Sequence, residues 1–281
     1  MNIELLSGVS MQTKTQKLEH KSPFCSYCEY TGIVRNPSFA EIGQEPLVLC
    51  PRCVLTKCEC DGQPPYYIEK NGTISNCYCR QIRMKINRIK TIYSRSGIDK
   101  KYQWRFFNSF EANSKLSSNA KNVAYDIVSK FPDVRKGLFL WGNPGTGKTL
   151  LSSIMLTELI IRHAIEGRYI KISRTFFNKL RATFAEGSAT YGTAQEIEYE
   201  LENADVLVVD DFGVQRDSAW EQETLYNLVD ARYEAEKFTI FTSNVDPHRA
   251  LADIAGGRVL SRIKEMCTIL ELTGPDYREK L

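Results

Sequence analysis

The sequence predicts an α/β protein with a parallel sheet, preceded by a small metal-binding module. Three observations lead to this prediction. Strand-like apolar runs alternate with helical patterns after residue 106, which is typical of a parallel sheet covered by helices on both faces. One of these runs leads directly into a glycine-rich phosphate-binding motif. Eight of the nine cysteines fall in four tight pairs between Cys25 and Cys79.

The composition is that of a soluble globular protein, with 42% hydrophobic and 25% charged residues in 281. No run approaches the roughly 20 apolar residues of a membrane span, and the first residues do not resemble a signal peptide. We therefore expect a cytoplasmic protein with no membrane contact. Charge divides the chain, because residues 1–105 carry a net +7 and residues 106–281 a net −4. We predict a tail over 1–20, a zinc-binding module over 21–80, a basic helical linker over 81–105 and an α/β domain over 106–281.

The cysteine pairs have the spacing of metal-binding knuckles. They are Cys25-x-x-Cys28, Cys50-x-x-Cys53, Cys58-x-Cys60 and Cys77-x-Cys79. Two knuckles complete one tetrahedral four-sulfur site, so the eight cysteines predict two Zn2+ ions with no cysteine left over. Disulfides are disfavoured in a reducing cytosol, whereas an iron–sulfur cluster uses the same ligands and stays an alternative. The sequence does not decide whether neighbouring pairs share a metal or the two sites interleave.

A turn signal lies between the last two cysteine pairs. The Asn71-Gly72 pair between short β-like runs predicts a type I′ hairpin, which would bring Cys77 and Cys79 back toward Cys58 and Cys60. Metal binding would then drive much of the folding of this module.

A basic amphipathic helix is predicted directly after the last cysteine pair. Six Lys and Arg residues with no acid lie between Arg80 and Arg95. Ile82, Ile86, Ile89 and Tyr93 recur at helical spacing. The basic face is either solvated or in contact with a nucleic-acid backbone.

The phosphate-binding motif follows the apolar run 138–141 and opens a helical pattern. Its residues are Gly142, Asn143, Pro144, Gly145, Thr146, Gly147, Lys148 and Thr149, followed by Leu150. Glycines let backbone N–H groups surround phosphates, and the helix N-terminus adds positive potential. Lys148 would reach the β- and γ-phosphates, and Thr149 would offer its hydroxyl to Mg2+. The motif therefore predicts that ATP or ADP binds here with Mg2+.

Two later strands end in polar residues. The apolar run 206–209 is followed by Asp210 and Asp211, and the run 238–241 leads to Asn244. Ligands of parallel sheets bind at the carboxyl ends of the strands, so we expect Asp210 to hold Mg2+ and Asp211 to polarise the attacking water. Asn244 could hold that water or the γ-phosphate, although acids and amides in such places also cap helices or begin turns.

Further elements complete the predicted sheet. Strands are expected at 169–172 and 266–272, and helices at 120–131 and 225–233. Near the end of the chain, Arg258 and Arg262 lie four residues apart on one predicted helix face. Such a pair either provides arginine fingers that reach the nucleotide of a neighbouring subunit or forms ion pairs with acidic residues on the protein's own surface.

The order of these motifs resembles that of AAA+ ATPases. More narrowly, it resembles DnaC/DnaI-type replicative helicase loaders and the related IstB family, over about residues 102–281. The resemblance rests on the phosphate loop, on Asp210-Asp211-Phe212-Gly213 and on the run from Ser261 to Cys267. It implies a five-stranded parallel sheet in which the Asn244 strand lies between the phosphate-loop strand and the Asp210 strand.

The resemblance also implies roles for individual residues. Lys148 would be catalytic, Asp210 would be the Walker B metal acid and Asp211 the catalytic acid. Asn244 would be sensor 1, and Arg258 would be the arginine finger, assisted by Arg262. The usual second acid is Glu, so the shorter Asp211 implies slow hydrolysis. Only 19 residues follow Arg262, so we expect a truncated lid without sensor 2.

Three functions are compatible with these features. In the first, the zinc module binds a DnaB-type replicative helicase, and the AAA+ domain self-associates and places the helicase on single-stranded DNA. Phe176 and Phe177 could stack on its bases, or they could form a buried helix face. In the second, the chain is an IstB-like transposition helper that binds duplex DNA. In the third, it is a zinc-based adaptor with a nucleotide switch that does not hydrolyse ATP.

Overall fold

The computed structural model describes residues 25–29, 31–36, 44–172, 174–187, 191–213, 218–251 and 254–277. The chain divides into two compact units, Met1–Ile82 and Arg83–Leu281. The predicted tail over 1–20 lies outside the described residues, and the linker over 81–105 stays a prediction. Among the helices that the structure describes, none is both long and apolar enough to cross a membrane.

The first unit consists of two small antiparallel sheets. Strand β1 (Ile33–Arg35) pairs with β2 (Leu47–Leu49), and β3 (Tyr67–Lys70) pairs with β4 (Thr73–Asn76). A 3-10 turn, η1, spans Leu55–Lys57. Between β3 and β4, Asn71 and Gly72 both have positive φ, at 53° and 74°, as a type I′ turn requires. The predicted hairpin is therefore confirmed.

The predicted basic helix forms as α1, which spans Arg80–Ser94 and buries Ile86, Ile89, Ile92 and Tyr93. The Tyr93 hydroxyl lies 3.2 Å from the Thr157 hydroxyl. Lys85 donates to the backbone carbonyl of Arg162 at 3.4 Å, and burial lowers the pKa of Lys85. One cation of this helix thus binds the last turn of another helix, where cations are favourable.

The second unit is built on one parallel sheet. Its strands are β5 (Gly137–Trp141), β6 (Gly167–Lys171), β7 (Val206–Asp210), β8 (Phe238–Ser243) and β9 (Cys267–Glu271). Their spatial order is β6-β7-β8-β5-β9, and every neighbouring pair is parallel. The expected five-stranded sheet is confirmed, with the strand before Asn244 between the other two site strands.

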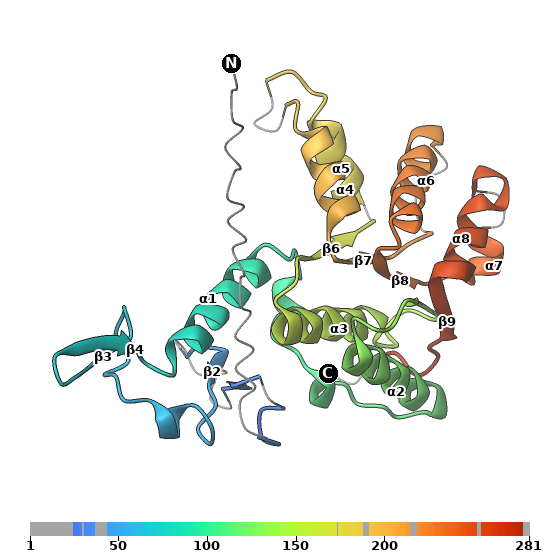
Figure 1. The fold of residues 1–281 in the computed structure, drawn as a ribbon. Coiled ribbons are helices and arrows are strands. Elements are labelled where there is room, and N and C mark those ends of the chain that lie inside the picture. Colours follow the sequence, from blue (N-terminus) through green and yellow to red (C-terminus); the bar gives the residue numbers. More distant parts are fainter. Residues whose placement is uncertain are drawn as a thin grey trace, which may run out of the picture. The chain divides into compact units, whose positions relative to one another are not determined.

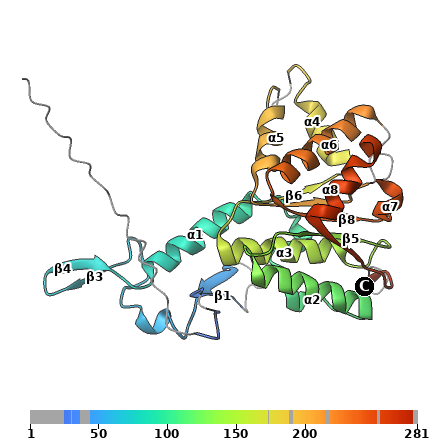
Figure 2. The ribbon, with the colours of Figure 1, turned by 45° about the vertical axis from the view of Figure 1, so that its right-hand side comes forward.

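Helices cover both faces of this sheet. They are α2 (Lys115–Lys130), α3 (Lys148–His163), α4 (Arg174–Ala182), α5 (Ala194–Asn203), α6 (Ala219–Glu234), α7 (Pro247–Ala250) and α8 (Arg258–Met266). Short 3-10 turns lie at η2 (Lys100–Tyr102), η3 (Phe107–Ser109) and η4 (Ile254–Gly257). Figures 1 and 2 show α2 and α3 on one face and α4 to α8 on the other.

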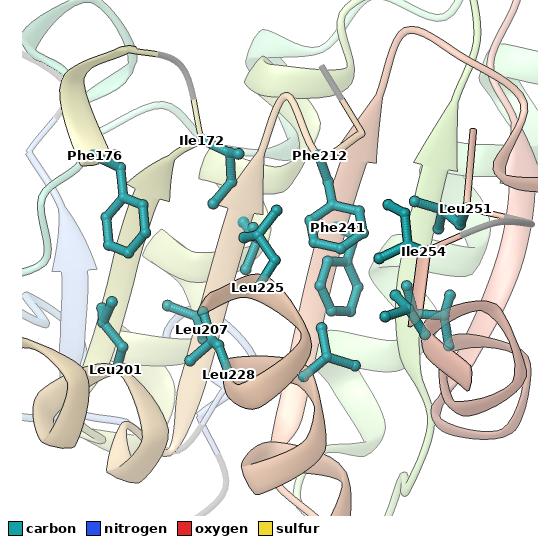
Figure 3. Packing of buried hydrophobic residues seen from close by; sticks show 14 of the residues in the cluster. Ile172, Phe176, Leu201, Leu207, Phe212, Leu225, Leu228, Phe241, Leu251 and Ile254 are labelled. Carbon is teal, nitrogen blue, oxygen red and sulfur yellow. The ribbon is translucent and has the colours of Figure 1, made fainter. Parts of the chain in front are cut away.

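The core between the sheet and the α4–α8 layer contains several aromatic rings. Phe212 and Phe241 lie 5.0 Å apart between ring centroids, and Leu225 of α6 points toward them (Figure 3). Cys267 at the start of β9 is buried, and burial raises the pKa of its thiol. A buried thiol of this kind behaves as a small hydrophobic side chain and is chemically inert. Because the central strands β5, β7 and β8 are buried on both faces, they form continuous apolar runs in the sequence.

Candidate nucleotide site and metal centres

The phosphate loop connects β5 to α3 at the carboxyl edge of the sheet. Gly147 immediately precedes α3 with a φ of +96°, and a Cβ there would lie 2.9 Å from the Phe110 ring. Gly142 has a φ of +143°, and a Cβ there would lie 2.2 Å from the carbonyl oxygen of Leu272. Only glycine fits both positions without strain or collision. The close packing therefore explains why the loop needs these glycines.

Lys148 lies inside the loop that precedes it. Its side chain is buried, and Nζ donates to the carbonyls of Gly142 at 2.8 Å and Asn143 at 2.6 Å. These bonds hold the ammonium group over the concave loop, at the N-terminus of α3. A buried cation in this place suits a polyphosphate, since the helix N-terminus adds positive potential.

Asp210 is completely buried at the end of β7. Its Oδ1 accepts hydrogen bonds from the hydroxyls of Thr149 at 3.0 Å and Thr242 at 2.5 Å. Thr149 and Asp210, predicted to hold Mg2+, are thus in contact. Hydroxyl and carboxylate oxygens are hard donors that fit Mg2+. The sequence analysis did not assign Thr242, although its place at the end of the neighbouring strand was the available signal.

Asp211 turns away from the strand, with a φ of +57°, a conformation that Asp tolerates better than most residues. Its carboxylate accepts from Asn244 Nδ2 at 3.3 Å and lies 3.1 Å from Lys171 Nζ. Burial lowers the pKa of Lys171, but the hydrogen bond and charge of Asp211 outweigh it and raise that pKa. Asp211 and Asn244 therefore meet as expected, and Lys171 is a neighbour that the sequence analysis missed.

A pocket of about 520 Å³ adjoins the phosphate loop. The residues that line it include Phe110, Asn113, Gly147, Leu150 and Tyr277. The backbone N–H of Tyr277 donates to the carbonyl of Gly145 at 3.2 Å. The volume is within the range of small-molecule sites, and its position next to the loop suits the nucleoside part of a nucleotide.

The two predicted finger residues lie on α8, against α6. Arg258 is exposed, and its guanidinium carbon lies 5.0 Å from the centroid of the Tyr226 ring. Arg262 also stacks on Tyr226, at 5.1 Å, and forms an ion pair with Asp230. Arg258 is thus presented to solvent, whereas Arg262 already has an acidic partner within the chain.

The eight cysteines form two separate groups of four. Within each group all sulfurs lie within 4.8 Å of one another. The first group contains Cys25, Cys28, Cys50 and Cys53, and the second contains Cys58, Cys60, Cys77 and Cys79. Neighbouring pairs therefore close locally, and the two groups do not interleave. The structure holds the cysteines as free thiols rather than disulfides.

The sulfur geometry fits a single tetrahedral ion. The Cys28–Cys53 and Cys60–Cys79 sulfurs are 3.5 Å apart, and the Cys25–Cys50 sulfurs are 3.8 Å apart. Zn–S bonds of about 2.3 Å give tetrahedral edges of about 3.8 Å. A four-iron cluster binds each thiolate on a different iron atom and holds the sulfurs farther apart. The groups therefore fit zinc better than such a cluster.

Backbone amides also favour the metal-binding form of two thiols. A hydrogen bond from the Cys28 backbone lowers the pKa of Cys25 to about 7. Burial raises the pKa of Cys77, but the backbone of Cys79, Glu59 and Cys60 outweighs it and lowers that pKa to about 6. The thiolate is the form that binds metal, so Cys25 and Cys77 are the thiols most ready to bind one, whereas burial raises the pKa of Cys28, Cys53 and Cys58.

Of the two alternatives for Phe176 and Phe177, the buried helix face is confirmed and the contact with single-stranded bases is wrong. Phe176 and Phe177 are only 7% and 2% exposed, so they cannot stack on bases. Phe184 is 61% exposed instead, and its ring packs edge-on to Trp220 at 6.5 Å. The guanidinium of Arg181 lies 5.2 Å from the centroid of the Trp220 ring. The sequence analysis missed this exposed aromatic group because it is not part of a regular apolar pattern.

The fold and the site define a nucleotide-binding protein of the AAA+ class. The sequence model of IstB-like ATP-binding proteins matches residues 88–281. Because this match covers more than half of the chain, the chain belongs to the IstB-like ATP-binding protein family. The resemblance found in the sequence is therefore confirmed.

Similar proteins include replicative helicase loaders. The replicative helicase loader DnaC of Buchnera aphidicola subsp. Schizaphis graminum is 25% identical over 218 residues, which cover 77% of this chain and 85% of that protein. The replicative helicase loader DnaC of Escherichia coli strain K12 is 27% identical over 180 residues, which cover 63% of this chain and 70% of that protein.

Solved structures share the fold. The crystal structure of the DnaC helicase loader has a TM-score of 0.54 at 28% identity and covers 62% of this chain and all of that one. The crystal structure of DnaI has a TM-score of 0.54 at 20% identity and covers 66% of this chain and 98% of that one. At that lower identity, DnaI is similar in fold alone.

Proposed function

We propose that this chain is an ATP-dependent replication protein that loads a DnaB-type replicative helicase onto single-stranded DNA. The contact between Thr149 and Asp210 beneath a complete phosphate loop is the observation that supports a nucleotide site most directly. The similar proteins named replicative helicase loaders are the reason for proposing a role in helicase loading. The protein would act in the cytoplasm.

The site residues have complementary tasks in ATP hydrolysis. Lys148 and the loop amides would hold the phosphates, and the 520 Å³ pocket beside Phe110 would take the nucleoside. Thr149 and Asp210 would hold Mg2+, which neutralises phosphate charge when bound. Asp211 would accept a hydrogen bond from the attacking water, and Asn244 would orient that carboxylate. A hydrolysis step of this kind depends mainly on positioning and electrostatics.

Assembly would complete the nucleotide site. Arg258 is exposed on α8, so it could reach the γ-phosphate held by a second copy, as arginine fingers do. Arg262 would keep its pairing with Asp230 and support the position of α8. We therefore assign the finger to Arg258 and an assisting role to Arg262.

Single-stranded DNA would contact the second unit through an aromatic surface. Phe184 and Trp220 provide an exposed ring and a second ring, and Arg181, which is ion-paired with Glu221, lies over the Trp220 ring. Stacking on aromatic rings with nearby positive charge is the usual way to bind single strands without sequence preference. The zinc module, with two Zn2+ held by the two cysteine groups, would bind the helicase.

Nucleotide binding is tested by titrating ATP and Mg2+ into the full chain by calorimetry. We expect Lys148→Ala to abolish binding, because it removes the cation inside the loop. Lys130→Ala is a matched control, since Lys130 is an exposed lysine paired only with Asp126 in the structure. Equal ATP affinity of Lys148→Ala and the wild-type protein would disprove the nucleotide site.

The loader activity is tested by co-purification with the replicative helicase of the host, with and without ATP. A chain lacking residues 1–79 should lose the helicase but keep ATP binding. If the full chain binds no helicase in either condition but coats duplex DNA in the presence of ATP, the transposition-helper alternative replaces the loader. If it binds the helicase and ATP but never hydrolyses ATP, the chain is a nucleotide-switched adaptor.

A further inference from the structure

A buried tyrosine lies beside Asp210, the aspartate proposed to hold Mg2+, without forming a hydrogen bond of normal geometry. Tyr169 of β6 is only 6% exposed. Its hydroxyl oxygen is buried and forms no hydrogen bond of normal geometry among the described residues, although the Asp210 carboxylate is close enough to interact with it. Buried polar groups in proteins are almost always paired. An exception next to a reaction site therefore calls for a physical explanation.

Strand register places this side chain on the same face of the sheet as Asp210. A Cβ at Gly167 would meet Leu156 of α3 at 2.7 Å, so Gly167 faces α3. Tyr169, two residues further along β6, faces α3 as well. Tyr169 is opposite Val208 in β7, and Asp210 is two residues beyond Val208. Diagonal neighbours of this kind are within reach of an aromatic side chain.

Electrostatics agree with that placement. Burial raises the pKa of Tyr169, and the Asp210 carboxylate raises it further through its charge and through a hydrogen-bonding interaction with the hydroxyl. The hydroxyl therefore keeps its proton at neutral pH and is available as a donor toward the carboxylate.

The Asp210 carboxylate has room for another donor. Both threonine hydroxyls, from Thr149 and Thr242, are bound to Oδ1. Oδ2 has only the longer contact with Thr149, at 3.3 Å. An ionised carboxylate has about four acceptor positions, so a small rotation that turns one oxygen toward a hydrated cation can bring the other toward Tyr169.

We propose that Tyr169 is a positioning residue of the magnesium site, and that its hydroxyl donates to Asp210 when this carboxylate binds hydrated Mg2+. The inference rests on the proposed nucleotide site. It explains why an unpaired hydroxyl is retained in a buried position, where a phenylalanine would avoid the cost of desolvating it. The free-energy cost of burying this hydroxyl in the unligated protein would be offset by its hydrogen bond to Asp210 when the metal binds.

The test compares two buried tyrosines in the full chain. Tyr169→Phe removes the unpaired hydroxyl, whereas Tyr93→Phe removes a hydroxyl that lies 3.2 Å from the Thr157 hydroxyl, within hydrogen-bonding distance. ATP affinity is measured by calorimetry with Mg2+ and with a chelator, and Tm is measured without ligand. The ratio of the two affinities reports the metal contribution separately from turnover.

Tyr169→Phe should leave the Tm of the unligated protein unchanged or raise it. It should reduce the Mg2+-dependent gain in ATP affinity by about tenfold, the scale of one hydrogen bond to a charged group. Tyr93→Phe should show the opposite pattern, with a lower Tm and an unchanged Mg2+ gain. An unchanged Mg2+ gain in Tyr169→Phe, or a lower Tm of its unligated form, would overturn the inference. If the wild-type protein itself binds no ATP, the proposed function fails as well.

Discussion

The buried Arg232 of α6 offers a direct test of how the second unit is held together. It is 1% exposed, and its guanidinium donates to the carbonyls of Leu201, Ala204 and Phe238 at 2.7, 2.9 and 2.7 Å. Its Nε donates to the Thr239 hydroxyl at 2.9 Å. One side chain thus connects the end of α5, helix α6 and the beginning of β8. Since β8 leads to Thr242 and Asn244, this connection supports the nucleotide site from the opposite edge of the sheet.

Arg232→Met keeps a long side chain but removes every donor. Burial lowers the pKa of Arg232 to about 9, against the opposing charge of Asp205, so the arginine remains charged at neutral pH. Its loss leaves four buried acceptors without a partner. At the lower bound of about 1 kcal/mol for each acceptor, the variant loses about 4 kcal/mol of unfolding free energy. For a domain of this size, the Tm should fall by about 8–16 °C.

Thermal unfolding of the full chain, followed by circular dichroism, measures this effect. Arg249→Met is the control, because Arg249 is an exposed arginine on α7, and its Tm should change by no more than about 2 °C. A decrease below about 3 °C for Arg232→Met would show that water or a rearranged backbone satisfies these acceptors. The assignment of Arg232 as a structural connection would then be wrong.

Three further outcomes are expected. A strong chelator should release two zinc ions per chain and unfold the first unit, as measured by a colorimetric zinc assay and circular dichroism, and release of no zinc would contradict the metal assignment. Phe184→Ala should weaken binding of single-stranded DNA by about tenfold in fluorescence anisotropy, because one stacked base is worth about 1–3 kcal/mol. Tyr199→Ala, which removes another exposed aromatic ring, should have little effect, and equal losses would exclude a specific role of Phe184. Gly145→Ala should reduce ATP affinity in calorimetry, because a φ of +78° strains a residue with a Cβ and that Cβ would displace the Asp276 side chain, and wild-type affinity would refute this.

Much of the fold could be predicted because the relevant signals are local. Strands buried on both faces read as apolar runs, and the runs before Gly142, Asp210 and Thr242 were all recognised. The phosphate loop combines a strand end, glycines and a helix start in consecutive residues. The turn at Asn71-Gly72 was also predictable, because its positive φ angles restrict the residue types that fit.

The residues predicted to carry the chemistry can be recognised without a structure, since the glycine loop, the paired acids and the cysteine knuckles are each defined by short spacing. Only the tertiary structure decided which of them meet. It separated the cysteines into two local groups, brought Lys171 to Asp211 and buried Phe176 in the core while exposing Phe184. The physical reason is that such contacts depend on strand order and on packing between distant segments. Neither is encoded in the spacing of neighbouring residues.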